Sequence, residues 1–229
     1  MAAPHPLDAP ILSSLTGRHS HFAVKRSGAY RYDPDYAVFA AVEDHSVASL
    51  AGLAELARLG DVALMDADAP SAGPSLELCS ENAGVQMVVA GPPEAKPIDV
   101  RIGQLGEDDA GDMLALATLT EPGPFFAKTH CLGEFYGVRE KGRLIAMAGE
   151  RLKPQGFTEI SGVCTHPDYQ GQGLAAALVG LMVRRISERG ETAFLHTYAR
   201  NTGAIALYQR LGFSLRREVR MLRLTRTRH

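Results

Sequence analysis

The stretch of sequence that decides the fold spans residues 163–175 and reads Val-Cys-Thr-His-Pro-Asp-Tyr-Gln-Gly-Gln-Gly-Leu-Ala. It leads from β-branched residues through a proline turn to two glycines, Gly171 and Gly173, which open an amphipathic helix. The first N–H groups of a helix have no partner within the helix and carry the positive end of its dipole. Glycines in the first turn leave room for a pyrophosphate directly on these N–H groups. The stretch therefore predicts a phosphate-binding turn between a strand and a helix.

The spacing of the glycines indicates which phosphate ligand this turn suits. The pattern Gly171-x-Gly173-x-x-Ala176 loosely matches the dinucleotide fingerprint, in which the first glycine follows its strand almost at once. Here a turn that contains Pro167 separates the strand from the glycines, and the chain has no G-x-x-x-x-G-K-[ST] loop for a nucleoside triphosphate. The pattern that remains is Gln170-x-x-Gly173-x-Ala175 after a strand and a short turn.

A second set of residues follows this pattern in the chain. Leu195-His196-Thr197 leads to Asn201, and the chain continues with Ala-Ile-Ala-Leu-Tyr at 204–208 and Leu-Gly-Phe at 211–213. Together the two motifs resemble the acyl-CoA signature, and the strand, helix and closing Leu-Gly-Phe that follow it, in the GNAT superfamily of N-acyltransferases. The resemblance covers residues from about Ile98 to Arg226.

The resemblance implies an α/β fold in which helices flank a central mixed β-sheet. Gly-Pro-Pro-Glu-Ala-Lys-Pro at 91–97 breaks any regular element, so we predict a boundary there. Residues 1–95 form a smaller α+β region and residues 96–229 a GNAT-like acyl-CoA-binding domain in this prediction. Three roles for the first region stay open: a degenerate second copy of the fold, a cap that shapes the acceptor site, or a dimerisation surface.

Apolar spacing and turn residues predict the regular elements. Helices are expected over 46–59, over 107–119, from residue 174 to the glycine at 190, and from the N-cap Asn201 to Gly212. Strands are expected over 62–65, 76–79, 85–89, 98–105, 135–139, 143–152, 157–165, 192–198 and 213–224. Gly162 inside a strand marks either a bulge or a packing accommodation. The resemblance implies that this strand leaves its neighbour here and opens a slot for the pantetheine arm.

Composition bounds the class of protein. The chain has 229 residues, of which 45% are hydrophobic and 22% charged, as in an ordinary globular protein. No apolar run approaches the ~20 residues of a membrane span, and the first ten residues lack the pattern of a signal peptide, so we expect a cytoplasmic protein without a membrane partner. Three cysteines without a C-x-x-C pattern indicate free thiols in a reducing compartment.

Charge is spread unevenly along the chain. Residues 101–229 carry 18 basic and 13 acidic groups, which would attract a polyanionic cofactor, although these arginines also suit an exposed strand and tail. Because aromatic residues do not alternate with them, we expect no nucleic-acid partner.

The resemblance implies acetyl-CoA as co-substrate. Backbone N–H groups of residues 171–176 would hold its pyrophosphate, and the strand end at 163–165 would pair with pantetheine. The predicted acyl-CoA-binding residues are Val163, Cys164, Thr165, Gln170, Gly171, Gln172, Gly173, Leu174, Ala175, Ala176, Asn201 and Tyr208.

Three residues are candidates for proton transfer. Tyr208 occupies the position where the resemblance implies a tyrosine that protonates the departing thiolate, although a tyrosine on this helix face also suits packing. The acceptor amine must lose a proton before it attacks. His196 is the first candidate for this base, at a position where several family members carry a glutamate, and Glu159 on the strand leading to the turn is the second. Each candidate base also has a purely structural interpretation. His196 suits a hydrogen-bonded histidine of the core, and Glu159 suits a solvated strand end.

The same residues favour some chemistries over others. His19 and His21 lack acidic or thiol partners at ligand spacing, so we expect no metal. Cys164 lacks a Cys-His-Asn/Asp pattern, which favours direct transfer over an acyl-cysteine route. Residues 121–126, with Thr129 and His130, occupy the loop and helix that vary with the acceptor in the family.

The sequence therefore predicts an N-acetyltransferase that acts on an amine of a small molecule or peptide by direct attack in a ternary complex. The alternative is a non-catalytic module that binds acyl-CoA as a sensor. A homodimer remains open.

Overall fold

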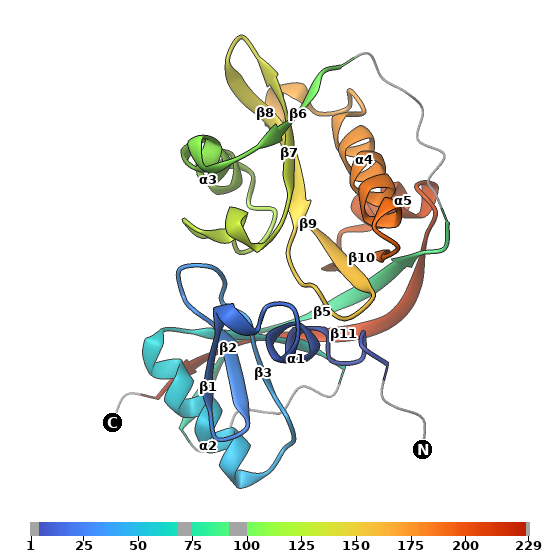
Figure 1. The fold of residues 1–229 in the computed structure, drawn as a ribbon. Helices are drawn as coiled ribbons and strands as arrows, with labels where there is room; N and C mark the ends of the chain where they lie inside the picture. The colour runs from blue at the N-terminus through green and yellow to red at the C-terminus, as the bar shows by residue number, and fades with distance from the viewer. Residues whose placement is uncertain (1–4, 68–74, 92–99, 228–229) are drawn as a thin grey trace.

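The computed structural model describes residues 5–67, 75–91 and 100–227. These residues form an eight-stranded mixed sheet and a three-stranded antiparallel sheet (Figure 1). The strands are β1 (Ala23–Arg26), β2 (Ala29–Tyr32), β3 (Ala40–Val42), β4 (Val62–Asp66), β5 (Leu76–Val89), β6 (Ile102–Leu105), β7 (Phe135–Glu140), β8 (Arg143–Glu150), β9 (Phe157–Thr165), β10 (Thr192–Tyr198) and β11 (Phe213–Arg226). The helices are α1 (Pro10–Thr16), α2 (Val47–Leu56), α3 (Ala110–Thr120), α4 (Leu174–Glu188) and α5 (Thr202–Arg210). Short 3₁₀ turns lie at Ser20–Phe22, Ala57–Leu59, Glu107–Asp109, Thr129–Leu132 and Pro167–Tyr169.

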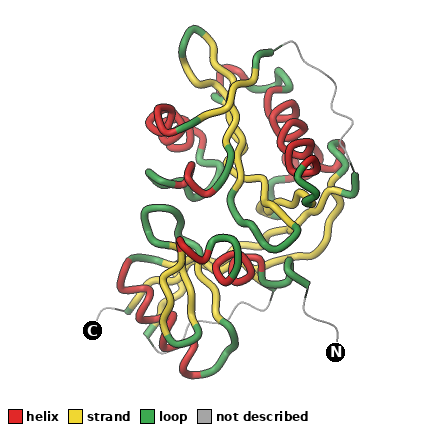
Figure 2. Tube along the Cα trace, viewed as in Figure 1, coloured by secondary structure: helices red, strands yellow, loops and turns green. Residues whose placement is uncertain are grey.

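The large sheet has the order β4-β11-β5-β10-β9-β8-β7-β6 and carries helices on both faces. α4 and α5 pack on one face through a core that includes Leu178, Met182 and Leu195. α3 packs against β8 and β9 on the opposite face through Met113 and Met147. Figure 2 shows the strands running through the middle of the molecule with the helices outside them. This arrangement confirms the predicted α/β fold with a mixed sheet flanked by helices.

The N-terminal elements form a second layer around one end of this sheet. α1 and the small sheet β1-β2-β3 pack against it through a core that includes Leu15, Tyr32, Phe39, Met65 and Phe194. No helix or strand was predicted before residue 46. The available signal was Ser27-Gly28, whose φ angles of 42° and 81° make the two-residue turn between β1 and β2.

Most predicted elements form within a few residues of the expected bounds. The two strands expected at 76–79 and 85–89 are one strand, β5, because its polar middle pairs with β11 on an exposed part of the sheet. The helix expected over 107–119 begins with a 3₁₀ turn and continues as α3. Residues 98 and 99, expected to start a strand, lie outside the described residues. None of the described helices combines the length and the apolar character that a membrane crossing requires.

β5 links the two predicted parts of the chain. It lies between β10 and β11 and pairs with both in antiparallel orientation. Residues on both sides of the predicted boundary therefore share the large sheet. The boundary itself falls within residues 92–99, which lie outside the described residues, so the division at residue 95 stays a prediction.

Candidate active site

A split in the large sheet forms the centre of the candidate site. β9 and β10 pair in parallel only over three rows, the last of which joins Glu159 and Phe194. Beyond this row β9 pairs with β8, and β10 pairs with β5. A bulge between β8 and β9 includes Gly162, whose φ of 63° favours glycine. The two strands therefore diverge, and their ladder ends at this row.

The glycine turn lies at the start of α4. His166 shapes the turn by accepting a hydrogen bond from the N–H of Asp168 at 3.2 Å. Gly171 and Gly173 have φ angles of 76° and 82°, and Gly173 caps α4 without any side-chain hydrogen bond. A Cβ placed on Gly171 would meet no protein atom within 4 Å. The first N–H groups of α4 thus begin beside open space, as a bound pyrophosphate requires.

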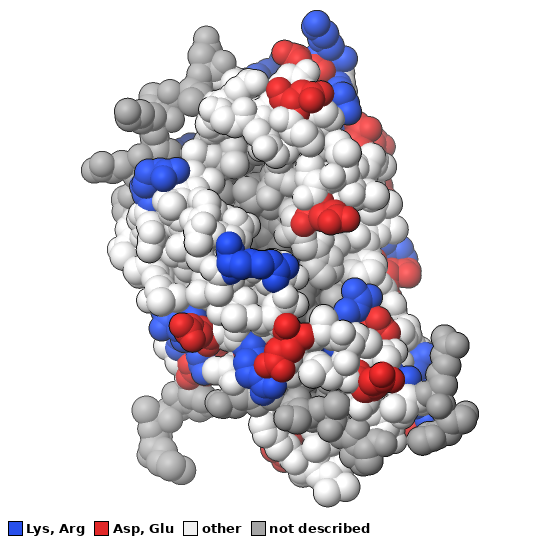
Figure 3. Space-filling model, turned by 180° about the vertical axis from the view of Figure 1, so that it is seen from behind, with Lys and Arg blue, Asp and Glu red and all other residues white. Residues whose placement is uncertain are grey.

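The gap and the turn open into one cavity of about 870 Å³. Seen from behind the view of Figure 1, the surface of the molecule is hollowed in its upper half (Figure 3). Of the predicted site residues, those that line the cavity are Val163, Cys164, Thr165, Gln170, Gly171, Ala175, His196, Asn201 and Tyr208. Predicted residues outside the lining are Glu159, Gln172, Gly173, Leu174 and Ala176. Leu174 and Ala176 point into or pack against the core, so only their backbone groups are candidates for phosphate contact.

Asn201 and Tyr208 bring α5 to the cavity. Oδ1 of Asn201 accepts a hydrogen bond from the N–H of Ala204 at 3.2 Å, which confirms the predicted N-cap. Tyr208 lies two turns further along the helix, and the residue is 9% exposed. Burial raises the pKa of its phenol to about 12, so the hydroxyl keeps its proton at neutral pH.

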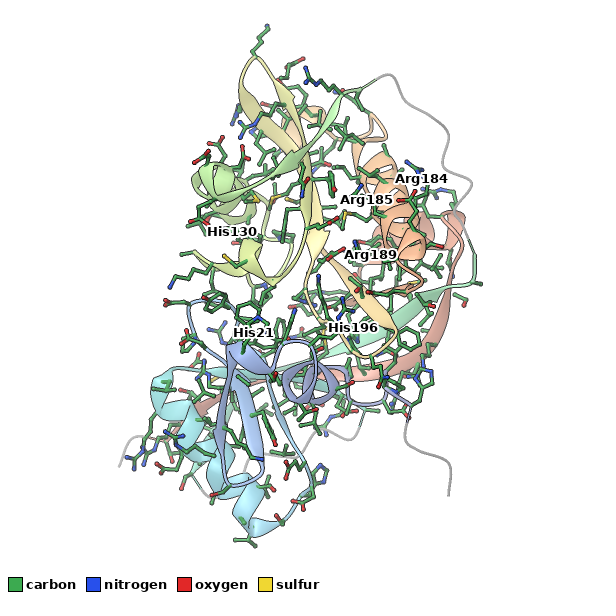
Figure 4. All side chains as sticks on the ribbon, in the orientation of Figure 1. His21, His130, Arg184, Arg185, Arg189 and His196 are labelled. Atoms are coloured by element: carbon green, nitrogen blue, oxygen red, sulfur yellow. The ribbon has the colours of Figure 1, made fainter. Side chains whose placement is uncertain are left out.

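The two candidate bases contact each other. Nδ1 of His196 lies 2.7 Å from Oε1 of Glu159, and both side chains are almost fully buried. Arg151 binds the same carboxylate through Nε and Nη2, each at 2.8 Å. Burial acts to raise the pKa of the Glu159 carboxyl, but the charge and hydrogen bonds of Arg151, with the bond from His196, lower it to about 2. Figure 4 shows His196 beside the point where β9 and β10 separate.

Gln86 fixes the other ring nitrogen of His196. Its Nε2 donates to the carbonyl of Leu7 at 3.0 Å, and its Oε1 accepts from Arg216 at 2.8 Å. The amide is thereby oriented with its second N–H toward Nε2 of His196, 3.1 Å away. His196 therefore carries its proton on Nδ1, toward Glu159, and a lone pair on Nε2.

Gln86 and Arg151 were not among the predicted site residues. Gln86 is the one amide in the apolar run Val-Gln-Met-Val-Val at 85–89, and it is fully buried. A polar side chain inside such a run was the available signal, because a buried amide requires partners. Arg151 gave no comparable signal, since it lies just beyond the end of β8.

Cys164 and part of the predicted acceptor loop line the cavity. Cys164 is buried, and burial raises the pKa of its thiol to about 11, so the thiol stays protonated at neutral pH. Glu121 and residues 122–124 of the predicted acceptor loop line the cavity, whereas Thr129 and His130 do not.

Two histidine groups lie apart from the cavity. Nδ1 of His19 lies 2.9 Å from the Tyr32 hydroxyl inside the N-terminal core. Nε2 of His130 lies 2.8 Å from Glu107 and 3.4 Å from Sγ of Cys131, a set of ligand types that the sequence analysis did not identify. Figure 4 shows His130 well away from His196, and the Glu107 side chain is 83% exposed, so this group takes no part in the candidate site.

Known proteins share this architecture. The FR47-like protein family matches residues 135–222, which include β9, the glycine turn and α5. Over 80 residues the chain is 34% identical to a [ribosomal protein bS18]-alanine N-acetyltransferase of Escherichia coli K12, which covers 34% of this chain and 53% of that enzyme. The chain thus spans about half the length of the curated relatives it matches.

Solved structures extend the similarity to the whole chain. The crystal structure of a GNAT-family protein from Novosphingobium aromaticivorans is 39% identical to this chain and superposes on it with a TM-score of 0.89. The superposition covers 98% of this chain and 100% of the Novosphingobium chain. A GCN5-related N-acetyltransferase from Kribbella flavida shares the fold, with a TM-score of 0.62, 16% identity and 96% coverage of each chain. This chain belongs to the GNAT family.

Proposed function

We propose that this protein transfers the acetyl group of acetyl-CoA to an amine of a small molecule or peptide. One observation carries the proposal: the divergent strands and the glycine turn open into the same cavity as Tyr208 and His196. In the proposal, the site that holds the thioester and the pyrophosphate is therefore continuous with the site of proton transfer. Membership of the GNAT family supports the same reaction.

The described residues fit acetyl-CoA. The backbone of Gly171 borders open space, because a Cβ added there would contact no protein atom. The first N–H groups of α4 follow Gly171 in the chain. Backbone groups of Val163 and Cys164 lie along the gap where β9 has left β10. In the proposal these groups hold the pyrophosphate and the pantetheine arm, while amides at the split polarise the thioester carbonyl.

Proton transfer is assigned to His196 and Tyr208. The amine nitrogen bonds to the acetyl carbon, the carbon–sulfur bond breaks, and an amide and a CoA thiol result. The amine loses one proton to Nε2 of His196, and the Tyr208 hydroxyl gives one to the departing sulfur. Because Gln86 contacts Nε2 in this structure, His196 accepts the proton when the amine or a bridging water replaces that contact. Glu159 holds the ring through Nδ1.

The test is the release of CoA thiol from acetyl-CoA with separate pools of small amines, amino acids and short peptides. Acceptor-dependent release, with an acetylated product of the expected mass, would support the proposal. Calorimetric titration with acetyl-CoA accompanies the assay. Binding without release in any pool would instead favour the non-catalytic sensor, and absence of binding would reject both functions.

A further inference from the structure

The face of the sheet that carries His196 continues well beyond the catalytic centre. In the strand registers, His196 pairs with Gln86, Tyr198 with Gly84, and Met221 with both Asn82 and Met65. Directly paired residues share a face, and so do residues two apart on one strand. Tyr198, Asn82, Met65 and Met221 therefore form one surface with His196, and all five line the cavity. We call this surface the acceptor floor.

The acceptor floor lies opposite the face that holds the acyl-CoA elements. Leu195 and Met87, which point the other way, pack under α4 and α5. In the proposed function, acetyl-CoA occupies the α4 and α5 side, and its thioester lies at the split in the sheet. The acceptor floor is thus the surface left for the molecule that attacks the thioester.

Apolar side chains form one part of the floor and its walls. Met221 lies across Gly84, where an added Cβ would come 2.5 Å from its methyl carbon. Val38 and Phe39 run beside β4 and form a wall, since the N–H of Ala63 donates to the carbonyl of Val38 at 2.9 Å. Pro122 and Pro124 line the other side. The N-terminal region thereby supplies much of this part of the cavity.

The charged groups of the cavity are already paired or lie at its edge. Arg151 is bound at two points by Glu159, and its guanidinium lies 4.4 Å from the centre of the Phe39 ring. Arg223 is largely exposed and contacts Asp61 at 3.0 Å. Among the described lining residues, Glu121 is the one carboxylate, and it is exposed. A second ammonium group would find no carboxylate on the acceptor floor, and an acceptor carboxylate would find no unpaired arginine there.

We propose that the acceptor is a primary monoamine with an apolar body, which packs between Met221, Met65 and the Phe39 wall. This inference rests on the proposed acetyl transfer and names its acceptor class. Buried methylenes strengthen binding, whereas a second buried charge without a partner weakens it. Straight-chain monoamines should therefore outperform diamines of the same length, and amino acids should react poorly.

The experiment compares propylamine through hexylamine with the matching α,ω-diamines, spermidine, free amino acids and a short peptide with an N-terminal alanine. We expect kcat/KM to rise about fourfold for each methylene of the monoamines until the floor is covered. Each diamine should fall at least tenfold below its monoamine. If kcat/KM is higher for diamines, spermidine, amino acids or the peptide than for the monoamines, this inference is wrong, but the proposed acetyl transfer is still supported. Absence of transfer to every amine would instead reject the proposed function.

Variants test whether the acceptor floor causes the preference for monoamines over diamines. Met221→Glu places a carboxylate on the floor, so hexylamine should lose about tenfold or more in kcat/KM and the diamine should gain. Met221→Leu keeps the floor apolar and should retain the preference for hexylamine. Leu78→Glu adds the same charge to an exposed part of β5 outside the cavity and should leave both amines unchanged. Acetyl-CoA binding by each variant checks its fold. An unaltered preference in a Met221→Glu protein that still binds acetyl-CoA would contradict the assignment.

Discussion

Nδ1 of His196 lies 2.7 Å from Oε1 of Glu159, across the point where β9 and β10 separate. Glu159 pairs with Phe194 in the last paired row of the two strands. His196 lies two residues beyond Phe194 on β10. The split in the sheet thus brings a buried carboxylate to the buried ring of a residue that lines the cavity. Arg151 on one side and Gln86 on the other complete a buried polar chain whose orientation is fixed at both ends.

Glu159→Gln should destabilise the fold at neutral pH. The Glu159 carboxyl has a pKa of about 2 in the folded protein against an ordinary 4.5, because Arg151 and His196 favour its charged form despite burial. Its contribution is present above about pH 4.5 and is lost as the pH falls toward 2. We expect a loss of about 3 kcal/mol at pH 7, since Arg151 would stay buried without its partner.

Urea unfolding at pH 7 and at pH 3 measures this difference in free energy. The gap between native protein and Glu159→Gln should be narrower at pH 3. Glu81→Gln is the matched control, because Glu81 forms a largely exposed ion pair whose loss should cost at most about 1 kcal/mol. Equal stability of Glu159→Gln and Glu81→Gln at pH 7 would contradict the buried network.

Gln86→Glu tests whether His196 accepts the proton of the amine. A carboxylate in place of the amide would accept a hydrogen bond from a protonated Nε2, and Arg216 would stabilise the new charge. An Nε2 that donates to this carboxylate cannot also accept the proton of the amine, so kcat/KM at neutral pH should fall about tenfold or more. Gln104→Glu, on exposed β6, should leave kcat/KM unchanged. If Gln86→Glu keeps the native kcat/KM, another group is the base.

Gly171→Ala should weaken acetyl-CoA binding more than it weakens the fold. Gly171 and Gly190 both have φ near 75° and both have open space where a Cβ would lie, but they stand at opposite ends of α4. Alanine at either position should cost about 1 kcal/mol of stability. Only at Gly171 would the added methyl group occupy space next to the first N–H groups of the helix. Calorimetry should show weaker acetyl-CoA binding for Gly171→Ala alone, and equal Kd values in both variants would argue against a phosphate site here.

Tyr208→Phe should lower kcat while leaving the Kd for acetyl-CoA nearly unchanged. The phenol supplies a proton to the leaving sulfur in the proposal, and general acids of this kind contribute about 10²-fold or more. Burial raises its pKa to about 12, so native kcat should show no basic limb from Tyr208 up to about pH 10. Tyr136→Phe removes a hydroxyl from a buried ring outside the cavity and serves as the control. Native turnover in Tyr208→Phe would show that another group protonates the thiolate.

The sequence by itself determined the parts of the protein that depend on local chemistry. Gly171, Gly173 and the apolar repeat of α4 predict a glycine turn that leads into a helix, and the structure contains both. Asn201 capped α5 as expected, because a cap needs only its own side chain and the next turn. Together with the motif order, these signals were enough for the fold class and the family.

Only the tertiary structure decided which side chains meet. Gln86 and His196 are 110 residues apart in the chain, and they touch because β5 enters the sheet between β10 and β11. His196 and Glu159 were separate candidates in the sequence, and the end of the β9–β10 pairing made them one hydrogen-bonded pair. The N-terminal region carried no family motif, yet its strands supply part of the acceptor floor. Strand pairing over long sequence separations places these residues, and no local pattern encodes it.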